Sequence, residues 1–272
     1  MSSIAFLGAG NIAQAIMGGL LGSDGLPDSK NRDHKLFAFD PVDACRNAAA
    51  DIGATISGSN REAIKQAEVV ILCVKPNVVP ALVEEEAASL KDKLTISVAA
   101  GITTETILGQ LGPDAAVVRC MPNTPALVKT GMTALFATPG VTDTQKDLAQ
   151  DILSAVGETL WVQEESALDA VTAVSGSGPA YFFLMMEAMI AAAEAEGLGP
   201  ETARQLVLQT ALGASTMAHA STDSPAQLRI NVTSPGGTTQ AALETFEALG
   251  LPDTVRKAVK AARIRSEELS QS

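Results

Sequence analysis

Aromatic residues, cysteine and histidine are scarce in this sequence, and each scarcity excludes a class of function. Its 272 residues include one Trp, one Tyr, three Cys and two His. Two histidines, His34 and His219, cannot form a His-rich metal cluster and argue against a Ser-His-Asp triad, so no metal site is expected. Basic residues are also few, since 19 Lys and Arg against 31 Asp and Glu give a net charge of −12. An acidic chain with almost no rings to stack on bases argues against nucleic-acid binding.

The cysteines and the apolar runs indicate where such a protein resides. Cys45, Cys73 and Cys120 are an odd number without C-x-x-C spacing, and the last two lie in apolar runs. This pattern favours inert thiols in a reduced protein over a redox role. The N-terminus lacks the basic residues of a secretory signal, and the longest apolar run, 180–193, is too short to span a bilayer. We therefore expect a soluble, cytoplasmic protein without a membrane partner.

Residues 1–162 alternate short apolar runs with helical patterns. The continuous apolar run at 68–74 is typical of a parallel strand that is covered on both faces. The alternation predicts a doubly wound parallel sheet, and the Thr- and Gly-rich segment 124–138 should add antiparallel or edge structure. Strands are expected at 4–7, 36–39, 68–74, 94–98 and 116–119, and helices at 11–21, 42–52, 80–90, 104–110 and 144–156.

After Trp161 the pattern changes to one without a convincing strand. Ala, Leu, Met and Glu recur at helical spacing, and no flexible linker intervenes. Helices are expected at 166–174, 179–197, 200–220, 224–231, 239–249 and 252–269. The sequence thus predicts an α/β chain with an N-terminal Rossmann-type dinucleotide-binding domain, residues 1–162. An all-α domain that binds substrate and dimerises, residues 163–272, follows it.

A glycine-rich motif follows the first expected strand directly. Residues 8–13, Gly-Ala-Gly-Asn-Ile-Ala, fit G-x-G-x-x-A between a strand and a helix. The first glycine permits a tight turn, the second lets the backbone approach a pyrophosphate, and the small third residue allows the helix to pack on the strand. The helix N-terminus supplies N–H groups for the phosphate charge, and Asp40 ends the second strand. These features predict dinucleotide binding, against the alternative of a tight turn that binds nothing.

Two further turns lie at the same predicted sheet edge. Lys75 and Pro76 follow the strand at 68–74, where a lysine could contact cofactor hydroxyls or phosphate or could simply be solvated. Small residues, Val98 to Gly101, end the next strand and suit close approach by a nicotinamide, although small residues are common in any such turn.

A second glycine-rich turn, Ser-Pro-Gly-Gly-Thr-Thr at 234–239, precedes a helical run. Two glycines before a helix expose several N–H donors together, which predicts a carboxylate-binding site. The alternative is an ordinary N-cap by Thr238 or Thr239. A Gly/Ser break at 175–178 precedes the most apolar helix and could allow two elements or two subunits to approach closely. It is not a nucleophile elbow, because no strand precedes it.

The chain resembles pyrroline-5-carboxylate reductase in five motifs, which lie in order over nearly its whole length. They are I-A-F-L-G-A-G-N-I-A-x-A-I at the start, V-K-P at 74–76, R-C-M-P-N-T-P at 119–125, S-G-S-G-P-A-Y at 175–181 and S-P-G-G-T-T at 234–239. The last two are specific to that family, whereas the first is shared by Rossmann enzymes. The resemblance implies the last step of proline biosynthesis, the reduction of L-1-pyrroline-5-carboxylate to L-proline by NAD(P)H. NADP(H) is the expected cofactor, with NAD(H) as a competing one because Asp40 favours a free ribose hydroxyl.

The resemblance also implies the roles of individual residues. Those implied to line the dinucleotide are Gly8, Ala9, Gly10, Asn11, Ile12, Asp40, Asn60, Cys73, Val74, Lys75, Pro76, Val98, Ala99, Ala100 and Asn231. Those implied to surround the substrate are Glu165, Ser234, Gly236, Gly237, Thr238 and Thr239, with Thr239 beside the reacting nitrogen. An insertion at 23–34 departs from the family pattern and lengthens the loop near the adenine end.

Self-association is expected as well. Long apolar stretches at 181–193 and 206–217 lie in a short helical domain with limited interior, so part of their surface should be buried against another copy. The alternative is that both helices lie wholly inside their own bundle. The resemblance favours dimers through this domain, or rings of dimers.

Other functions share the two-domain plan. One is a different imine reductase or a β-hydroxyacid dehydrogenase, although the latter relies on a catalytic lysine and residues 163–250 contain no Lys. Another is a regulator that senses a dinucleotide without turnover.

Overall fold

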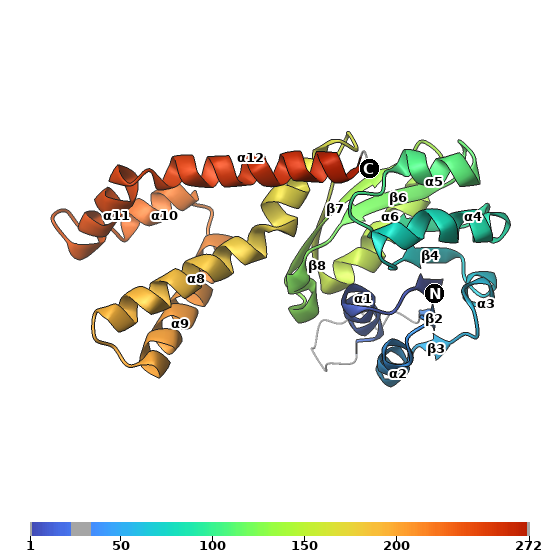
Figure 1. Cartoon of the computed structure of the whole chain (residues 1–272), viewed down its shortest axis with the longest axis horizontal. Helices are drawn as coiled ribbons and strands as arrows, with labels where there is room; N and C mark the ends of the chain where they lie inside the picture. Colours follow the sequence, from blue (N-terminus) through green and yellow to red (C-terminus); the bar gives the residue numbers. More distant parts are fainter. Residues whose placement is uncertain (1, 23–33, 271–272) are drawn as a thin grey trace. The chain divides into compact units, whose positions relative to one another are not determined.

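One mixed β-sheet forms the centre of the N-terminal part of the chain. In the computed structural model, which describes residues 2–22 and 34–270, eight strands pair in the order β3-β2-β1-β4-β5-β6-β7-β8 (Figure 1). The first six positions reproduce the 3-2-1-4-5-6 order of a doubly wound dinucleotide-binding sheet. The strands are β1 (Ser3–Leu7), β2 (Lys35–Phe39), β3 (Thr55–Ile56), β4 (Val69–Leu72), β5 (Leu94–Ser97), β6 (Val117–Met121), β7 (Gly131–Ala137) and β8 (Gly157–Trp161).

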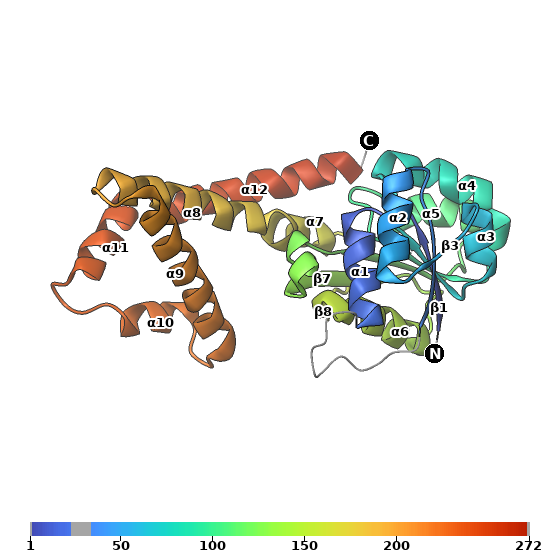
Figure 2. The ribbon, with the colours of Figure 1, turned by 90° about the horizontal axis from the view of Figure 1, so that it is seen from below.

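Helices cover both faces of this sheet, which explains the apolar character of its central strands. One face packs against α1 (Asn11–Leu21), α2 (Asp43–Ile52) and α6 (Asp143–Leu153) in one apolar cluster. The other packs against α3 (Asn60–Lys65), α4 (Val79–Leu90) and α5 (Thr104–Leu111) in a second cluster (Figure 2). All four residues of β4 are buried because each face has its own helical layer. The doubly wound α/β architecture is therefore confirmed.

The strands predicted from apolar runs are present in the structure. Strands that are very short, or in which polar and apolar residues are mixed, were not predicted. β7 is antiparallel to β6, as the Thr- and Gly-rich segment indicated. Neither β3, with two residues, nor β8, whose residues alternate between exposed and half-buried, was expected. The short helix α3 was also missed. Most of the insertion at 23–34 lies outside the described residues.

Helices make up the rest of the described chain after β8. They are α7 (Ala167–Val171), a π-helical turn (Thr172–Gly176), α8 (Gly178–Ala195), α9 (Pro200–Ala220), α10 (Pro225–Asn231), α11 (Thr238–Ala248) and α12 (Leu251–Ser270). The six expected helices match these elements to within a few residues. No helix in the described ranges combines the length and the apolar character needed to cross a membrane.

Two compact units result, which we call the sheet unit and the helical unit. The sheet unit runs to Ser177 and includes the chain from Ala262 onward, and the helical unit is Gly178–Ala261. The sequence placed its division at 162/163, just after the last strand. The sheet unit extends further because α7 contacts β6 and β7, and because Ser266 on α12 donates a hydrogen bond to Asp169 on α7 (2.6 Å).

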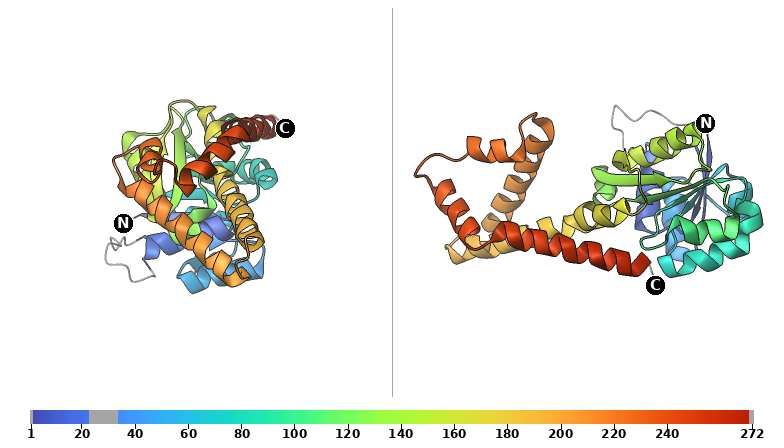
Figure 3. Two further views of the ribbon diagram at one scale, coloured as in Figure 1. Left: turned by 90° about the vertical axis from the view of Figure 1, so that its left-hand side faces the viewer. Right: turned by 90° about the horizontal axis from the view of Figure 1, so that it is seen from above.

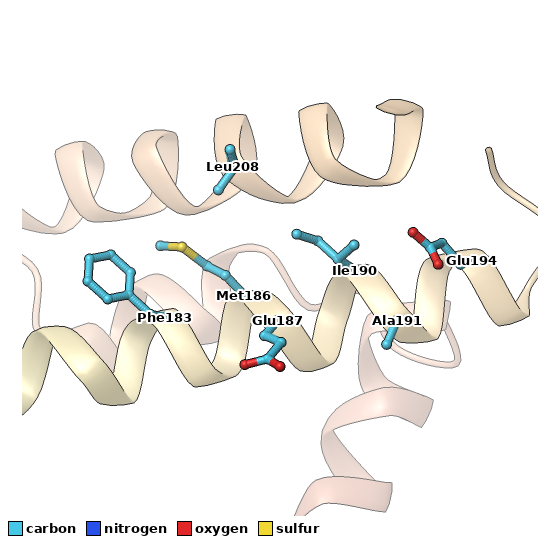
Figure 4. Close-up of a pocket in the computed structure, with 7 residues that line it drawn as sticks. All are labelled: Phe183, Met186, Glu187, Ile190, Ala191, Glu194 and Leu208. Atoms are coloured by element: carbon cyan, nitrogen blue, oxygen red, sulfur yellow. The ribbon is translucent and has the colours of Figure 1, made fainter. Parts of the chain in front are cut away.

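The helical unit exposes much of its apolar surface. Its helices α8 and α9 pack side by side (Figure 3), and Figure 4 shows Met186 and Ile190 of α8 directed toward α9, where Leu208 lies. Even so, Gly178 is the one buried residue among the described residues of α8, and Phe183 is 62% exposed. The alternative in which both helices are wholly enclosed by their own bundle is wrong, because α8 keeps apolar side chains outside its contact with α9.

Candidate functional site

The glycine-rich turn between β1 and α1 packs closely against neighbouring backbone at Gly8 and is open at Gly10. Gly8 has a φ of +95°, and a Cβ there would lie 2.8 Å from backbone atoms of Cys73 and Val74. Gly10 is extended, and a Cβ there would meet nothing within 4 Å. Gly10 also caps α1 without any side-chain hydrogen bond to the first N–H groups of the helix. The N–H groups of Gly8 and Ala9 donate to Phe39 and Asp40, so the donors left for the pyrophosphate of a dinucleotide are the first N–H groups of α1, next to the free space at Gly10.

Asp40, at the end of β2, is tied to this turn. Its Oδ2 accepts a hydrogen bond from the N–H of Ala9, and its Oδ1 accepts one from the N–H of Val42, both at 2.8 Å. Arg46 donates to the carbonyl oxygen of Asp40 (2.5 Å) and pairs with the Asp43 carboxylate. Asp40 therefore fixes the turn, and each carboxylate oxygen keeps a second lone pair for a ribose hydroxyl.

The other expected cofactor residues lie at the same edge of the sheet. β1, β2, β4 and β5 are neighbouring parallel strands, so the turns that follow them share one edge. Lys75 is exposed at the start of a short 3₁₀ turn, Ala99 is buried, and Asn60 begins α3 directly after its N-cap Ser59. Asn60 follows β3, which pairs in parallel with β2, so the segments that carry these residues all follow neighbouring parallel strands at one edge of the sheet.

The thiols near this edge are held in their neutral form. Burial raises the pKa of the Cys73 thiol well above its usual range, with a smaller contribution from Cys120. Burial also raises the pKa of Cys120 to about 12, partly offset by the positive charge of Arg119. A thiol without thiolate character is a poor nucleophile, so these cysteines serve packing.

Glu165 is held by two partners from distant parts of the sheet unit. Its Oε1 accepts hydrogen bonds from the N–H of Thr104 and from Nη1 of Arg119, both at 2.8 Å. Its Oε2 accepts one from Oγ1 of Thr104 at 2.5 Å. The side chain of Arg119 is 8% exposed and that of Glu165 is 22% exposed. The carboxylate is therefore fixed in place while part of its side chain remains accessible.

The R-C-M-P-N-T-P segment contacts the Gly/Ser break. Asn123 donates from Nδ2 to the carbonyl oxygen of Ser175 (3.0 Å) and accepts through Oδ1 from the N–H of Met132 (2.9 Å). A Cβ at Gly176 would lie 2.7 Å from Cε of Met121. Two elements of the sheet unit therefore approach closely at this break, and the atom nearest to Gly176 is the end of a flexible methionine side chain.

In the helical unit, the turn at 234–239 exposes the start of α11. Gly237 caps this helix without a side-chain hydrogen bond, so neither Thr238 nor Thr239 acts as the N-cap. Gly236 has a φ of +70°, and its N–H donates to Oε1 of Gln240 at 2.7 Å. The alternative of an ordinary threonine N-cap is therefore wrong, and α11 begins with donors that no side chain occupies.

Asn231, the one expected cofactor residue of the helical unit, has partners within its own unit. It accepts from Nε2 of Gln227 (2.8 Å) and donates to Oδ2 of Asp223 (3.3 Å). The substrate residues are divided in the same way, since Glu165 belongs to the sheet unit and positions 234–239 belong to the helical unit.

Sequence reasoning missed Thr104 and Arg119 as partners of Glu165. The signal for Arg119 was a cation inside the otherwise apolar strand 116–120, where a buried charge needs a partner. Nothing local marked Thr104, because it lies 61 residues from Glu165.

Comparison with known proteins agrees with this geometry. The sequence model described as "Pyrroline-5-carboxylate reductase dimerisation" matches residues 165–269. The model described as "NADP oxidoreductase coenzyme F420-dependent" matches residues 3–101. The first covers the helical unit with its flanks, and the second covers the glycine-rich turn and the strands that surround it.

Full-length relatives carry one name. A pyrroline-5-carboxylate reductase of Pseudomonas aeruginosa is 47% identical over 270 residues, which is 98% of this chain and 97% of that protein. The structure of a pyrroline-5-carboxylate reductase from Coxiella burnetii is 41% identical with a TM-score of 0.90, covering 100% of this chain and 99% of that one. A pyrroline carboxylate reductase of Plasmodium falciparum, solved with NADP bound, is 30% identical with a TM-score of 0.84, covering 99% and 98%.

Proposed function

This chain belongs to the pyrroline-5-carboxylate reductase family, and we propose that the N-termini of α1 and α11, whose N-cap residues are glycines, bind the two anionic ligands of the family's reaction. The chain reduces L-1-pyrroline-5-carboxylate to L-proline in proline biosynthesis, with NADP(H) as cofactor. The observation that carries the proposal is the start of α1 and that of α11, each capped by a glycine without a side-chain hydrogen bond. Such starts are suited to phosphate and carboxylate groups.

The sheet unit would hold the dinucleotide at the edge formed by β1, β2, β4 and β5. Its pyrophosphate would sit on the turn at 8–12, with the adenine ribose near Asp40 and Asn60. Residues 73–76 and 98–100 would line the rest of the cofactor, and the family resemblance implies Asn231 as a further cofactor residue. When bound, the cofactor supplies the hydride, and the protein supplies binding, orientation and electrostatics.

The helical unit would bind the substrate carboxylate on the N–H groups of Thr238 and Thr239, because the N–H of Gly237 already donates to the carbonyl oxygen of Ser234 at 3.0 Å. Ser234 and Gly236 shape this turn. The hydroxyl of Thr239 would hold the ring nitrogen, either by donating to it or by orienting an imine that binds already protonated. The family resemblance implies Glu165 as a further substrate contact, in which its carboxylate would accept a hydrogen bond.

We further propose that the exposed apolar surface of α8 and α9 is covered by a second copy of the chain. A dimerisation model matches this region, and α8 exposes Phe182, Phe183 and Leu184. An interface of this kind is apolar and obligate, like a domain core cut in half. Such dimers could assemble into rings, and we place the enzyme in the cytoplasm, where reduced thiols persist.

The direct test is turnover of pyrroline-5-carboxylate, followed as the loss of NADPH absorbance at ~340 nm. Thr239→Ala should lower kcat/KM by about 10- to 1,000-fold, the range of one transition-state hydrogen bond, with little change in NADPH affinity. Ser234→Ala, which removes a more peripheral hydroxyl, should have the smaller effect.

Activity of Thr239→Ala within about twofold of the wild type would remove Thr239 from the mechanism. Binding of NADPH by the wild type without turnover of the imine would favour the dinucleotide-sensing alternative instead.

A further inference from the structure

We propose that Thr104 and Arg119 are positioning residues that hold the Glu165 carboxylate in the one orientation that leaves an acceptor site for the substrate nitrogen. The inference rests on the proposed substrate contact of Glu165, and it adds two residues that the sequence pattern did not assign to the site.

The three residues come from separate elements of the sheet unit. Thr104 is the first residue of α5, Arg119 lies within β6, and Glu165 lies in the turn between β8 and α7. Their sequence separations are 61 and 46 residues, so only the folded sheet brings them together. Three hydrogen bonds from two residues then fix one carboxylate, which restricts every torsion of the glutamate side chain.

These hydrogen bonds leave one acceptor site of the Glu165 carboxylate unused. An ionised carboxylate offers about four lone-pair sites, two on each oxygen. Oε1 accepts both the N–H of Thr104 and Nη1 of Arg119, so its sites are occupied. Oε2 accepts one hydrogen bond, from Oγ1 of Thr104, and keeps one site. The side chain of Glu165 is 22% exposed, so a ligand can reach it.

The charges indicate which ligand group fits that remaining site. An ionised carboxylate only accepts hydrogen bonds, so its partner must carry a proton on nitrogen or oxygen. The guanidinium of Arg119 balances the negative charge of Glu165, so the pair as a whole is neutral. A site of this kind suits the N–H of a cyclic imine that binds already protonated, and in that case the hydroxyl of Thr239 orients the same N–H as a second acceptor and does not donate to the nitrogen.

Thr104 also links this site to the cofactor edge. It lies three positions after Gly101, at the end of the turn at 98–101 that follows β5. The hydrogen bonds that fix Glu165 therefore also fix the turn on which the cofactor would rest. We expect the loss of the Thr104 hydroxyl to disturb the reaction geometry while leaving the pyrophosphate-binding turn at 8–12 intact.

The test uses the isosteric variant Thr104→Val, with Thr104→Ser as the conservative rescue. Valine keeps the volume and the backbone N–H at this buried position but removes the hydroxyl, whereas serine keeps the hydroxyl. Thr104→Val should lower kcat/KM for the imine about 10- to 150-fold, the value of one hydrogen bond to a charged group, and Thr104→Ser should restore most of it. The Kd for NADPH should stay within about twofold in both variants.

A double-mutant cycle with Glu165→Gln separates positioning from a structural effect. If Thr104 acts through the carboxylate, Thr104→Val should cost nothing further in the Glu165→Gln background. Arg119→Met should behave in the same way. If that variant does not fold, because it leaves Glu165 without its cation, the Thr104 pair still decides the question.

Each result has one meaning. An equal loss from Thr104→Val in both backgrounds, or no loss in the wild-type background, overturns the positioning role while the Glu165 contact stands. Full activity of Glu165→Gln overturns that contact and the positioning role with it, although turnover by the wild type still supports the reaction. Absence of turnover in the wild type overturns the proposed function itself, and the positioning role falls with it.

Discussion

Substitution by alanine should have different effects at Gly8 and Gly10. At Gly8 it should lower the stability of the protein, and at Gly10 it should lower the affinity for NADPH. Alanine at Gly8 must adopt a φ near +95°, and its Cβ must fit 2.8 Å from backbone atoms of Cys73 and Val74. The left-handed conformation costs about 1–2 kcal/mol and overpacking about 1–3 kcal/mol, for a total of about 2–5 kcal/mol. At ~2–4 °C per kcal/mol for a chain of this size, the Tm should fall by about 4–20 °C.

Alanine at Gly10 meets neither obstacle. The residue has a φ of −74° and a ψ of −173°, which alanine adopts freely, and its Cβ would lie in open space. The Tm of Gly10→Ala should therefore stay within about 2 °C of the wild type. That open space is where the pyrophosphate would approach the backbone, so the Kd for NADPH should rise at least about tenfold.

The assays are thermal unfolding without cofactor, at one protein concentration, and fluorescence titration with NADPH. Gly18→Ala is the matched control, because it lies in the middle of α1 with nothing within 4 Å of its Cβ. It should raise the Tm by about 2–4 °C through helix propensity and leave the Kd unchanged. NADPH binding by Gly10→Ala within twofold of the wild type would refute the assignment of this turn to the pyrophosphate.

Three further predictions follow from the same structure. Asp40→Ser should shift preference from NADH toward NADPH, because it removes a negative charge beside the ribose, and should lower the Tm by several degrees, because two backbone N–H groups lose their acceptor. An unchanged ratio of the two Kd values would mean that Asp40 serves the turn alone. Met185→Glu or Met189→Glu should weaken the dimer and reduce activity, since each places a charge on the exposed apolar surface of α8. A fully active wild-type monomer at nanomolar concentration in analytical ultracentrifugation would contradict this. Cys73 and Cys120 should not react with a disulfide reagent at about pH 8 until the protein unfolds, because a thiol with a pKa of about 12 is ionised in about one molecule in 10⁴. Rapid reaction of both in the native enzyme would show that this edge opens.

The fold could be predicted from the sequence wherever a pattern is local. The strands β1 and β4 consist mostly of apolar residues and are buried along almost their whole length, and helical spacing marked α8 to α12. β8 was missed because its inward positions are only half-buried, so it lacks a continuous apolar run. β3 was missed because two residues carry no periodicity.

The candidate site was predictable only in part, for the same reason. The turns at 8–13 and 234–239 could be found in the sequence because glycines precede a helical pattern in both. Both helices begin without a side-chain cap in the structure. The partners of Glu165 could not be found this way, because they depend on the register of β6 beside β5. The link between Asp40 and the N–H of Ala9 joins two strand ends, and only the order β2-β1 makes it possible.

The course of α12 has a consequence for how the protein is made. The ribosome completes β1 to β8 well before it reaches the C-terminus, so the sheet can begin to fold while the helical unit is still being synthesised. Yet Leu269, close to the end of the chain, lies against Gly101 in the turn after β5, where a Cβ would be 3.1 Å from the Leu269 carbonyl oxygen. That turn gains its last neighbour only after the whole helical unit has left the ribosome. A nascent chain that has not yet released α12 therefore carries a sheet in which the turn after β5 lacks its contact with Leu269.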